Sequence, residues 1–309
     1  MMKLNLYQKT ALTTVIATLV LILIGGLVRA VGAGLGCPDW PKCFGMWIPP
    51  TSAAELPPGY DASQFNPLHT WLEYVNRLAG VIIGIFITAT FVISLRYRKS
   101  EIKITIASGV AFILVLFQGW LGGQVVRSEL SAGMITIHMI TAMVIVNTLL
   151  YACFKAMSDL LITKTDAKTK RILLWISGVL LFMTLVQLVM GTQVREAVDV
   201  SKNILSLPRE RWIDSIGWLY EVHRSFSWLI VLLGGLLVFF NGKYEVSTRL
   251  VKTGWVIGGL ILLQIIVGVG MERLDMPGLL QMVHLVSVTL LICTEFLYML
   301  ILGFSKQEV

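Results

Sequence analysis

Hydrophobic residues occur in long runs along this chain, and short polar segments separate the runs. Each run is about twenty residues long, which is the length that an α-helix needs to cross roughly 30 Å of membrane hydrocarbon. The pattern predicts eight transmembrane helices, at residues 10–30, 73–95, 104–124, 134–155, 173–193, 216–240, 253–271 and 279–304. The expected fold class is therefore an all-α polytopic membrane protein.

Part of this pattern occurs twice. Residues 118–127 read QGWLGGQVVR and are followed eleven positions later by His138. Residues 264–273 read QIIVGVGMER and are followed eleven positions later by His284. The two halves of the chain are therefore expected to share one arrangement of helices.

A second pair of segments supports the repeat. The segment EYVNRL at residues 73–78 matches YEVHRS at residues 220–225. We therefore expect two pseudo-symmetric four-helix bundles, residues 1–157 and residues 173–309, joined by a charged cytoplasmic connector at residues 158–172.

The composition excludes a soluble globular protein, because 56% of the residues are hydrophobic, 14% are charged and the mean hydropathy is +0.79. Lysine and arginine gather in the segments 96–103 and 155–171, so we expect these segments and both termini to be cytoplasmic. The net charge of +7 follows mostly from this topology and does not indicate nucleic-acid binding. The first hydrophobic run is longer than a signal-peptide core, so we expect it to be retained.

Three of the four histidines occupy repeat positions: His138, His223 and His284. Each is expected one to two turns inside a helix from the outer side, where an imidazole is costly without a partner. Two histidines on facing helices of a bundle can ligate an iron from both sides, and we interpret His223 and His284 as such a pair. A hydrogen-bonding core histidine is the alternative for any one of them.

The first half differs, because Asn76 stands where the second half has His223, and His138 has no matching partner. Glu73 lies one turn before Asn76, and His69 lies one turn before Glu73, so all three share a helical face. Glu73 could instead be a helix-start carboxylate, and His69 could be an interfacial residue. Because His69 lies about 10 Å along the helix from Asn76, we favour a hydrogen bond to Glu73 over iron ligation.

Arginine repeats three times per half, at the outward ends of predicted helices. The segment GGLVR at residues 25–29 matches GTQVR at residues 191–195 and supplies one of the pairs. The matched pairs are Arg29 with Arg195, Arg77 with Arg224, and Arg127 with Arg273. A guanidinium group can bind a carboxylate in bidentate fashion, so these arginines are candidates for binding the propionates of haem. Contacts with lipid phosphates or with nearby carboxylates are the alternative.

Four cysteines fall into two kinds of position. Cys37 and Cys43 lie in the long first outer loop, where they could form a disulfide on the oxidising side or be a reactive pair. Cys153 and Cys293 lie within predicted helices and are interpreted as packing residues.

Together these motifs resemble the haem A synthase family, whose members are membrane oxidases that convert haem O to haem A for terminal oxidases. The resemblance covers nearly the whole chain, although the usual first motif of the family has histidine where this chain has Asn76. It rests on GGLVR at 25–29, Cys37 and Cys43, EYVNR at 73–77, His138, EVHR at 221–224 and His284.

The resemblance implies a prokaryotic cytoplasmic (inner) membrane protein with both haem sites toward the outer face. A cofactor haem b is expected between His223 and His284, with its propionates bound by Arg195, Arg224 and Arg273. Haem O, the substrate, is expected in the first half and would leave as haem A. The residues expected around it are His138 as iron ligand, Asn76, His69, Arg77, Arg127 and Arg29.

The resemblance also implies the chemistry and the partners. The C8 methyl group would be oxidised to a formyl group with oxygen from water, and Glu73, which matches an essential glutamate of the family, would position or deprotonate that water. Cys37 and Cys43 would form a disulfide that orders the outer loop. Haem O synthase is the expected donor and cytochrome oxidase assembly the expected destination, while a homo-oligomer is left open.

Two other functions are weighed against this hypothesis. A dihaem electron-transfer subunit of the b type would need four ligating histidines, and Asn76 argues against it. A haem carrier would bind without reacting, and Glu73 would then be dispensable.

Overall fold

The computed structural model describes residues 4–158, 163–244 and 246–307. Within them, eight helices are long and apolar enough to span a membrane, so the predicted all-α membrane fold class is confirmed. Their bounds are α1 Leu6–Ala30, α2 Pro67–Ser94, α3 Ile102–Arg127, α4 Ala132–Ala156, α6 Ala167–Asn203, α8 Trp218–Lys243, α9 Thr248–Arg273 and α10 Gly278–Gly303.

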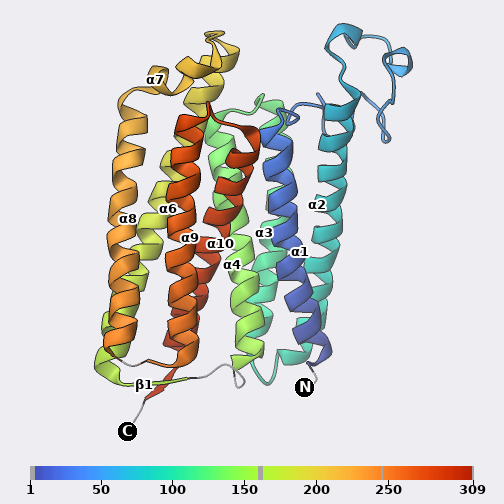
Figure 1. Cartoon of the computed structure of the whole chain (residues 1–309). Helices are drawn as coiled ribbons and strands as arrows, with labels where there is room; N and C mark the ends of the chain where they lie inside the picture. Colours follow the sequence, from blue (N-terminus) through green and yellow to red (C-terminus); the bar gives the residue numbers. More distant parts are fainter. Residues whose placement is uncertain (1–3, 159–162, 245, 308–309) are drawn as a thin grey trace. The chain divides into compact units, whose positions relative to one another are not determined.

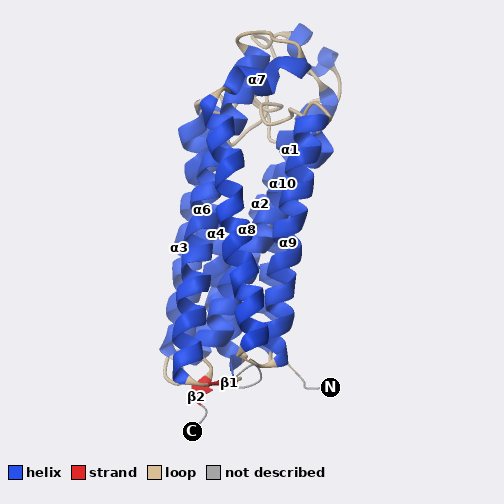
Figure 2. Cartoon of the chain, turned by 60° about the vertical axis from the view of Figure 1, so that its left-hand side comes forward, coloured by secondary structure: helices blue, strands red, loops and turns tan. Residues whose placement is uncertain are grey.

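The remaining described elements are short. Helix α7 spans Trp212–Ile216, and 3₁₀ helices span Ala53–Glu55, Ala62–Gln64, Leu95–Tyr97 and Arg209–Arg211. Strand β1, Lys164–Thr165, pairs in parallel with β2, Lys306–Gln307 (Figure 2). The sequence analysis did not predict these strands, because two residues are too few to show an alternating pattern.

The chain divides into two compact units, Met1–Ala152 and Cys153–Val309. The boundary falls near the end of α4, and residues 159–162 of the expected connector lie outside the described residues. In the first unit α2 packs against both α1 and α3. In the second unit α8 and α10 each pack against both α6 and α9, so α8 and α10 are diagonal in a four-helix bundle (Figure 1).

Local capping explains where several helices begin. Asn66 accepts a hydrogen bond from the His69 amide and is followed by Pro67, which starts α2. The Asp166 side chain accepts hydrogen bonds from the amides of Lys168 and Thr169, so α6 begins at Ala167, before the predicted hydrophobic run. Hydropathy marks only the apolar part of a helix, which is why α6 is also longer than predicted at its other end.

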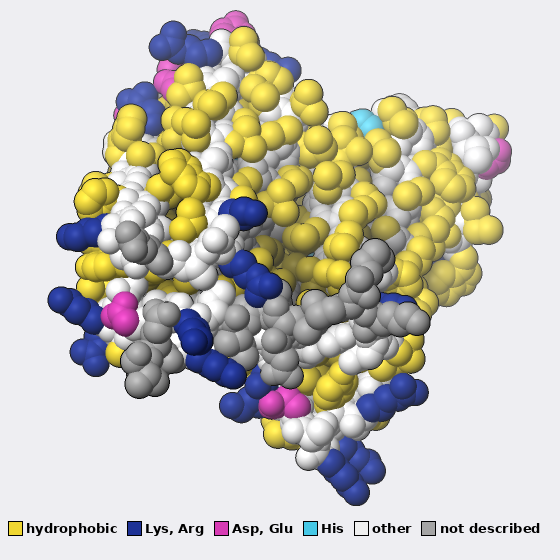
Figure 3. Space-filling model, turned by 60° about the horizontal axis from the view of Figure 1, so that its bottom comes forward, with side chains coloured by type: hydrophobic (Ala, Val, Ile, Leu, Met, Phe, Trp, Pro, Cys, Tyr) yellow, Lys and Arg dark blue, Asp and Glu magenta, His cyan; other side chains and the backbone are white. Residues whose placement is uncertain are grey.

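Hydrophobic side chains cover the sides of the helices, as expected for contact with lipid. Figure 3 shows lysine and arginine side chains gathered at one end of each unit, where α1 begins in the first unit and where β1 and β2 lie in the second. Exposed members of this group include Arg96, Arg98, Lys99, Lys103, Lys168 and Arg171. The cytoplasmic orientation of this end stays a prediction from the distribution of positive charge.

Candidate functional site

The three repeat histidines lie in the second turns of their helices: His138 in α4, His223 in α8 and His284 in α10. His284 lies close enough to His223 for charges on the two imidazoles to interact. Their helices, α10 and α8, are diagonal in the second unit. The Nδ1 atom of each of the three imidazoles is buried and has no hydrogen-bond partner among the described residues. Buried polar atoms of this kind suit an additional partner such as a bound group.

A glycine of the neighbouring helix stands beside each imidazole. A Cβ atom placed at Gly191 would lie 3.3 Å from His223 Cε1. The corresponding distances are 3.8 Å from Gly122 to His138 Cε1 and 3.9 Å from Gly268 to His284 Cε1. Glycine therefore leaves beside each ring a space that a side chain would fill.

A glutamine four residues before each glycine donates a hydrogen bond to the backbone carbonyl of the same histidine. The three Nε2 to oxygen distances are 3.0 Å from Gln118 to His138, 2.9 Å from Gln187 to His223, and 2.8 Å from Gln264 to His284. This bond fixes the turn that carries the imidazole. The sequence analysis did not assign a role to these glutamines, although Gln118 and Gln264 open the two copies of the repeat.

Glu73 is buried, with 6% of its surface exposed, although it lies near the beginning of α2. Its Oε1 atom accepts a hydrogen bond of 3.0 Å from Nε of Arg77, one turn later. This ion pair offsets part of the cost of burying the carboxylate. No hydrogen bond joins Glu73 to His69 in the described part of the chain, so the role of His69 stays a prediction.

Arg77 also holds the outer loop. Its Nη1 donates to the carbonyl of Asp39 at 2.7 Å and of Lys42 at 2.9 Å, and its Nη2 donates to the carbonyl of Cys37 at 3.1 Å. Cys37 and Cys43 form a disulfide, so these carbonyls belong to one closed loop. A single guanidinium group thus connects the Glu73 carboxylate with the disulfide loop.

The loop is fitted closely to the first turn of α2 and to α3. A Cβ at Gly36 would collide with the His69 carbonyl, and the Thr70 hydroxyl donates to the Gly36 carbonyl at 2.9 Å. The Trp40 ring lies over Gly123 of α3, where a Cβ would be 3.0 Å away. The contact with the His69 carbonyl leaves room only for glycine at position 36. Together, these contacts order the loop over the end of the first unit at which α2 begins.

Aromatic contacts of Phe44 hold together the part of the loop that follows the disulfide. The Phe44 ring packs edge-on against Tyr60 and Phe65, with centroid distances of 5.2 and 5.5 Å. Desolvation, together with the negative charge of Asp39, raises the pKa of Tyr60.

The other arginines differ from Arg77 in their partners. Arg224 pairs with Glu221 at 2.6 Å and Glu272 at 3.2 Å, and Arg195 pairs with Asp199 at 3.0 Å. Three more lie in the last turns of α1, α3 and α9, namely Arg29, Arg127 and Arg273. Pairing with nearby carboxylates, the alternative weighed from the sequence, is observed for Arg77, Arg195 and Arg224, and binding of propionates stays a prediction.

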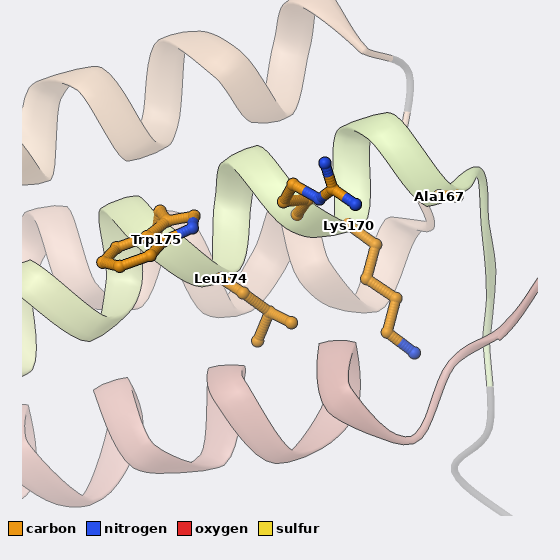
Figure 4. A pocket seen from close by; sticks show the side chains of 5 residues that line it. Ala167, Lys170, Leu174 and Trp175 are labelled. Atoms are coloured by element: carbon orange, nitrogen blue, oxygen red, sulfur yellow. The ribbon is translucent and has the colours of Figure 1, made fainter.

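One surface pocket lies at the beginning of α6 (Figure 4). It is lined by Ala167, Lys170, Arg171, Leu174 and Trp175. Lys170 Nζ donates to the carbonyls of Gly303 and Ser305, which attaches the end of α10 to α6. Trp175 stands sixteen residues before Gly191, about 24 Å along the helix, so this pocket is remote from the histidine site.

The geometry of the site can now be compared with known proteins. The sequence profile of the COX15-CtaA family, described as cytochrome oxidase assembly protein, matches residues 8–295. The chain belongs to this family. The resemblance inferred from the motifs is thereby confirmed.

Individual relatives of this family member cover most of its length. A heme A synthase of Shewanella oneidensis is 24% identical over 312 residues, which cover 91% of this chain and 92% of the relative. A heme A synthase of Rickettsia africae is 23% identical, with 97% of this chain and 99% of the relative covered. A heme A synthase of the Wolbachia strain from Brugia malayi is 25% identical, with 84% and 86% covered.

Replacing Gly191 with alanine should weaken binding of the haem that the resemblance predicts for the second unit. The new methyl group would stand 3.3 Å from His223 Cε1 and force the ring to shift, although alanine itself favours the helix. The haem content of the purified protein and the rate of haem transfer to apomyoglobin measure the effect. Gly178→Ala, on the same helix but beside the flexible end of Met299, is the matched control. Equal haem transfer rates for both variants would contradict the expectation.

Replacing Arg77 with lysine should reduce activity without unfolding the protein. One ammonium group cannot bind the Glu73 carboxylate and three loop carbonyls together, so both would be less well placed. Because small displacements of a reacting group are costly, we expect a loss of about 10- to 100-fold in haem A yield. Reduction of the Cys37–Cys43 disulfide, followed by thiol labelling, should also become faster. Arg98→Lys, on the exposed turn after α2, is the control, and unchanged labelling would argue against the link to the loop.

Proposed function

We propose that this chain is a haem A synthase, a membrane oxidoreductase that oxidises the C8 methyl group of haem O to a formyl group. One contrast supports this proposal above all. The second unit has two facing histidines, His223 and His284, whereas the first unit has one, His138, together with the buried carboxylate of Glu73. The second unit is suited to retaining a haem and the first to transforming one. The names of the relatives agree with this assignment.

The residues present in the second unit fit a haem b cofactor. Buried Nδ1 atoms without partners and a glycine beside each ring are the features that favour it. His223 and His284 would hold the iron, and Arg195, Arg224 and Arg273 would be near enough to the outer end to bind propionates. When bound, this haem would carry electrons one at a time to an external acceptor, and the conversion of a methyl group to a formyl group removes four electrons.

In the first unit, the substrate haem would be held by His138. Arg77 Nε orients the Glu73 carboxylate by binding Oε1, which leaves Oε2 to accept a proton from a water molecule. That water would supply the oxygen of the new formyl group. The disulfide loop, held by Arg77 and packed against α2 at Gly36 and against α3 through Trp40, would limit the entry of other water.

The proposal extends to cellular context. We place the protein in the prokaryotic cytoplasmic membrane with both haem sites toward the outer face. Haem O synthase would deliver the substrate, and cytochrome oxidase assembly would receive the product. Membership of a cytochrome oxidase assembly family supports the last of these.

The test is to extract and chromatograph haems from cells that express haem O synthase with or without this protein. We expect haem A only when the protein is present. If haem O persists while the purified protein retains bound haem, an electron-transfer protein or a haem carrier becomes the better account.

A further inference from the structure

Among the described residues, Gly25, Gly122, Gly191 and Gly268 each face a polar side chain near the beginning of the next helix. In three of them the side chain is histidine and a glutamine precedes the glycine by four residues. These three sets are Gln118, Gly122 and His138; Gln187, Gly191 and His223; and Gln264, Gly268 and His284.

The fourth position keeps only the glycine. A Cβ at Gly25 would lie 3.8 Å from Oδ1 of Asn76, the same separation as between Gly122 and His138 Cε1. Asn76 replaces the histidine, and Leu21, four residues before Gly25, replaces the glutamine. Two substitutions on two helices therefore coincide at one position, and the space beside the side chain is kept.

With these two substitutions, no side chain at this position can ligate the iron of a bound haem. The asparagine side chain presents an amide in place of an imidazole, whereas axial ligands of haem iron are histidine, cysteine, methionine or tyrosine. Leu21 cannot donate the hydrogen bond that fixes the backbone carbonyl at the other three positions. The turn that carries Asn76 is thus less restrained and its side chain is shorter.

We propose that the first unit binds its haem through His138 alone, and that Leu21 and Asn76 keep the opposite face of the iron open to a small ligand such as water. The inference rests on the proposed function in one respect, that a haem binds in the first unit. Glu73 lies one turn before Asn76 on the same helix, so the open face is on the side of the carboxylate. A haem with one protein ligand also leaves more readily than one with two, which suits a substrate that is released as product.

The test adds haem B to purified protein that already carries its resident haem, and follows the absorption spectrum and carbon monoxide binding after reduction. Carbon monoxide binds only where an axial position is open. We expect the added haem in the parent protein to bind carbon monoxide. In the double variant Leu21→Gln/Asn76→His, the added haem should become low-spin and lose carbon monoxide binding. His138→Ala should abolish binding of the added haem.

A reciprocal exchange keeps the test valid if the first double variant does not fold. Gln187→Leu/His223→Asn should make the resident haem of the second unit reactive toward carbon monoxide. Added haem that is already low-spin and unreactive in the parent protein would overturn the inference but leave the proposed function standing. Failure of the first unit to bind haem in a manner that depends on His138 would overturn both.

Discussion

Replacing Glu73 with glutamine should abolish haem A formation while bound haem is retained. Glutamine has nearly the same shape and its carbonyl oxygen can still accept the hydrogen bond from Arg77, but it cannot take a proton from water. Loss of a general base lowers a rate by about 10²- to 10⁴-fold, which would leave haem A below detection in extracted haems. The ratio of haem A to haem O in chromatographed extracts is the measurement.

The control for this variant is Glu55→Gln, because Glu55 is an exposed glutamate of the same outer loop that accepts hydrogen bonds from Thr51. It should leave the ratio unchanged. A normal ratio in Glu73→Gln would show that the carboxylate is not needed to form haem A, and would overturn the role proposed for Glu73. A fall of the haem A to haem O ratio in both variants would indicate that activity needs an intact loop, and would not support proton transfer by Glu73.

Replacing His284 with alanine should cost the haem proposed for the second unit its low-spin state and weaken its binding. An iron held between His223 and His284 would lose one of its two protein ligands, and the glycine beside each ring offers no substitute. The purified variant should lack the low-spin spectrum of a haem with two imidazole ligands. It should also unfold at a lower temperature, since a ligand that binds only the folded state stabilises it.

His138→Ala is the matched control, because His138 lies in the other unit with the same glycine and glutamine contacts. It should leave the resident haem in place. His223→Ala should behave as His284→Ala does. Retention of a normal low-spin spectrum in both second-unit variants would exclude the pair as ligands.

The two matched arginines make different contacts, and the sequence repeat does not predict this difference. Arg77 and Arg224 occupy the same place in the repeat and were assigned the same role. In the structure, Arg77 binds Glu73 and three carbonyls of the disulfide loop, while Arg224 pairs with exposed carboxylates. The first outer loop has no copy in the second half, so an internal repeat could not predict contacts with it.

The sequence alone did not predict the disulfide or the glycine contacts either, for a similar reason. Sequence spacing left Cys37 and Cys43 open to several interpretations, and the folded loop brings them together. Gly25, Gly122, Gly191 and Gly268 belong to recognisable segments, but nothing along the chain says that each faces the ligand position of the next helix. That relation depends on how adjacent helices are rotated.

By itself, the sequence determined the eight membrane helices of the described residues, the repeated motifs and the positions of three histidines near helix ends. Those features follow from the transfer of about twenty consecutive side chains into hydrocarbon and from helical spacing, both of which are local. Only the tertiary structure decided that Arg77 joins Glu73 to the loop and that a glutamine holds each histidine turn. These contacts depend on the rotation of neighbouring helices and on the path of an irregular loop, which side-chain periodicity does not encode.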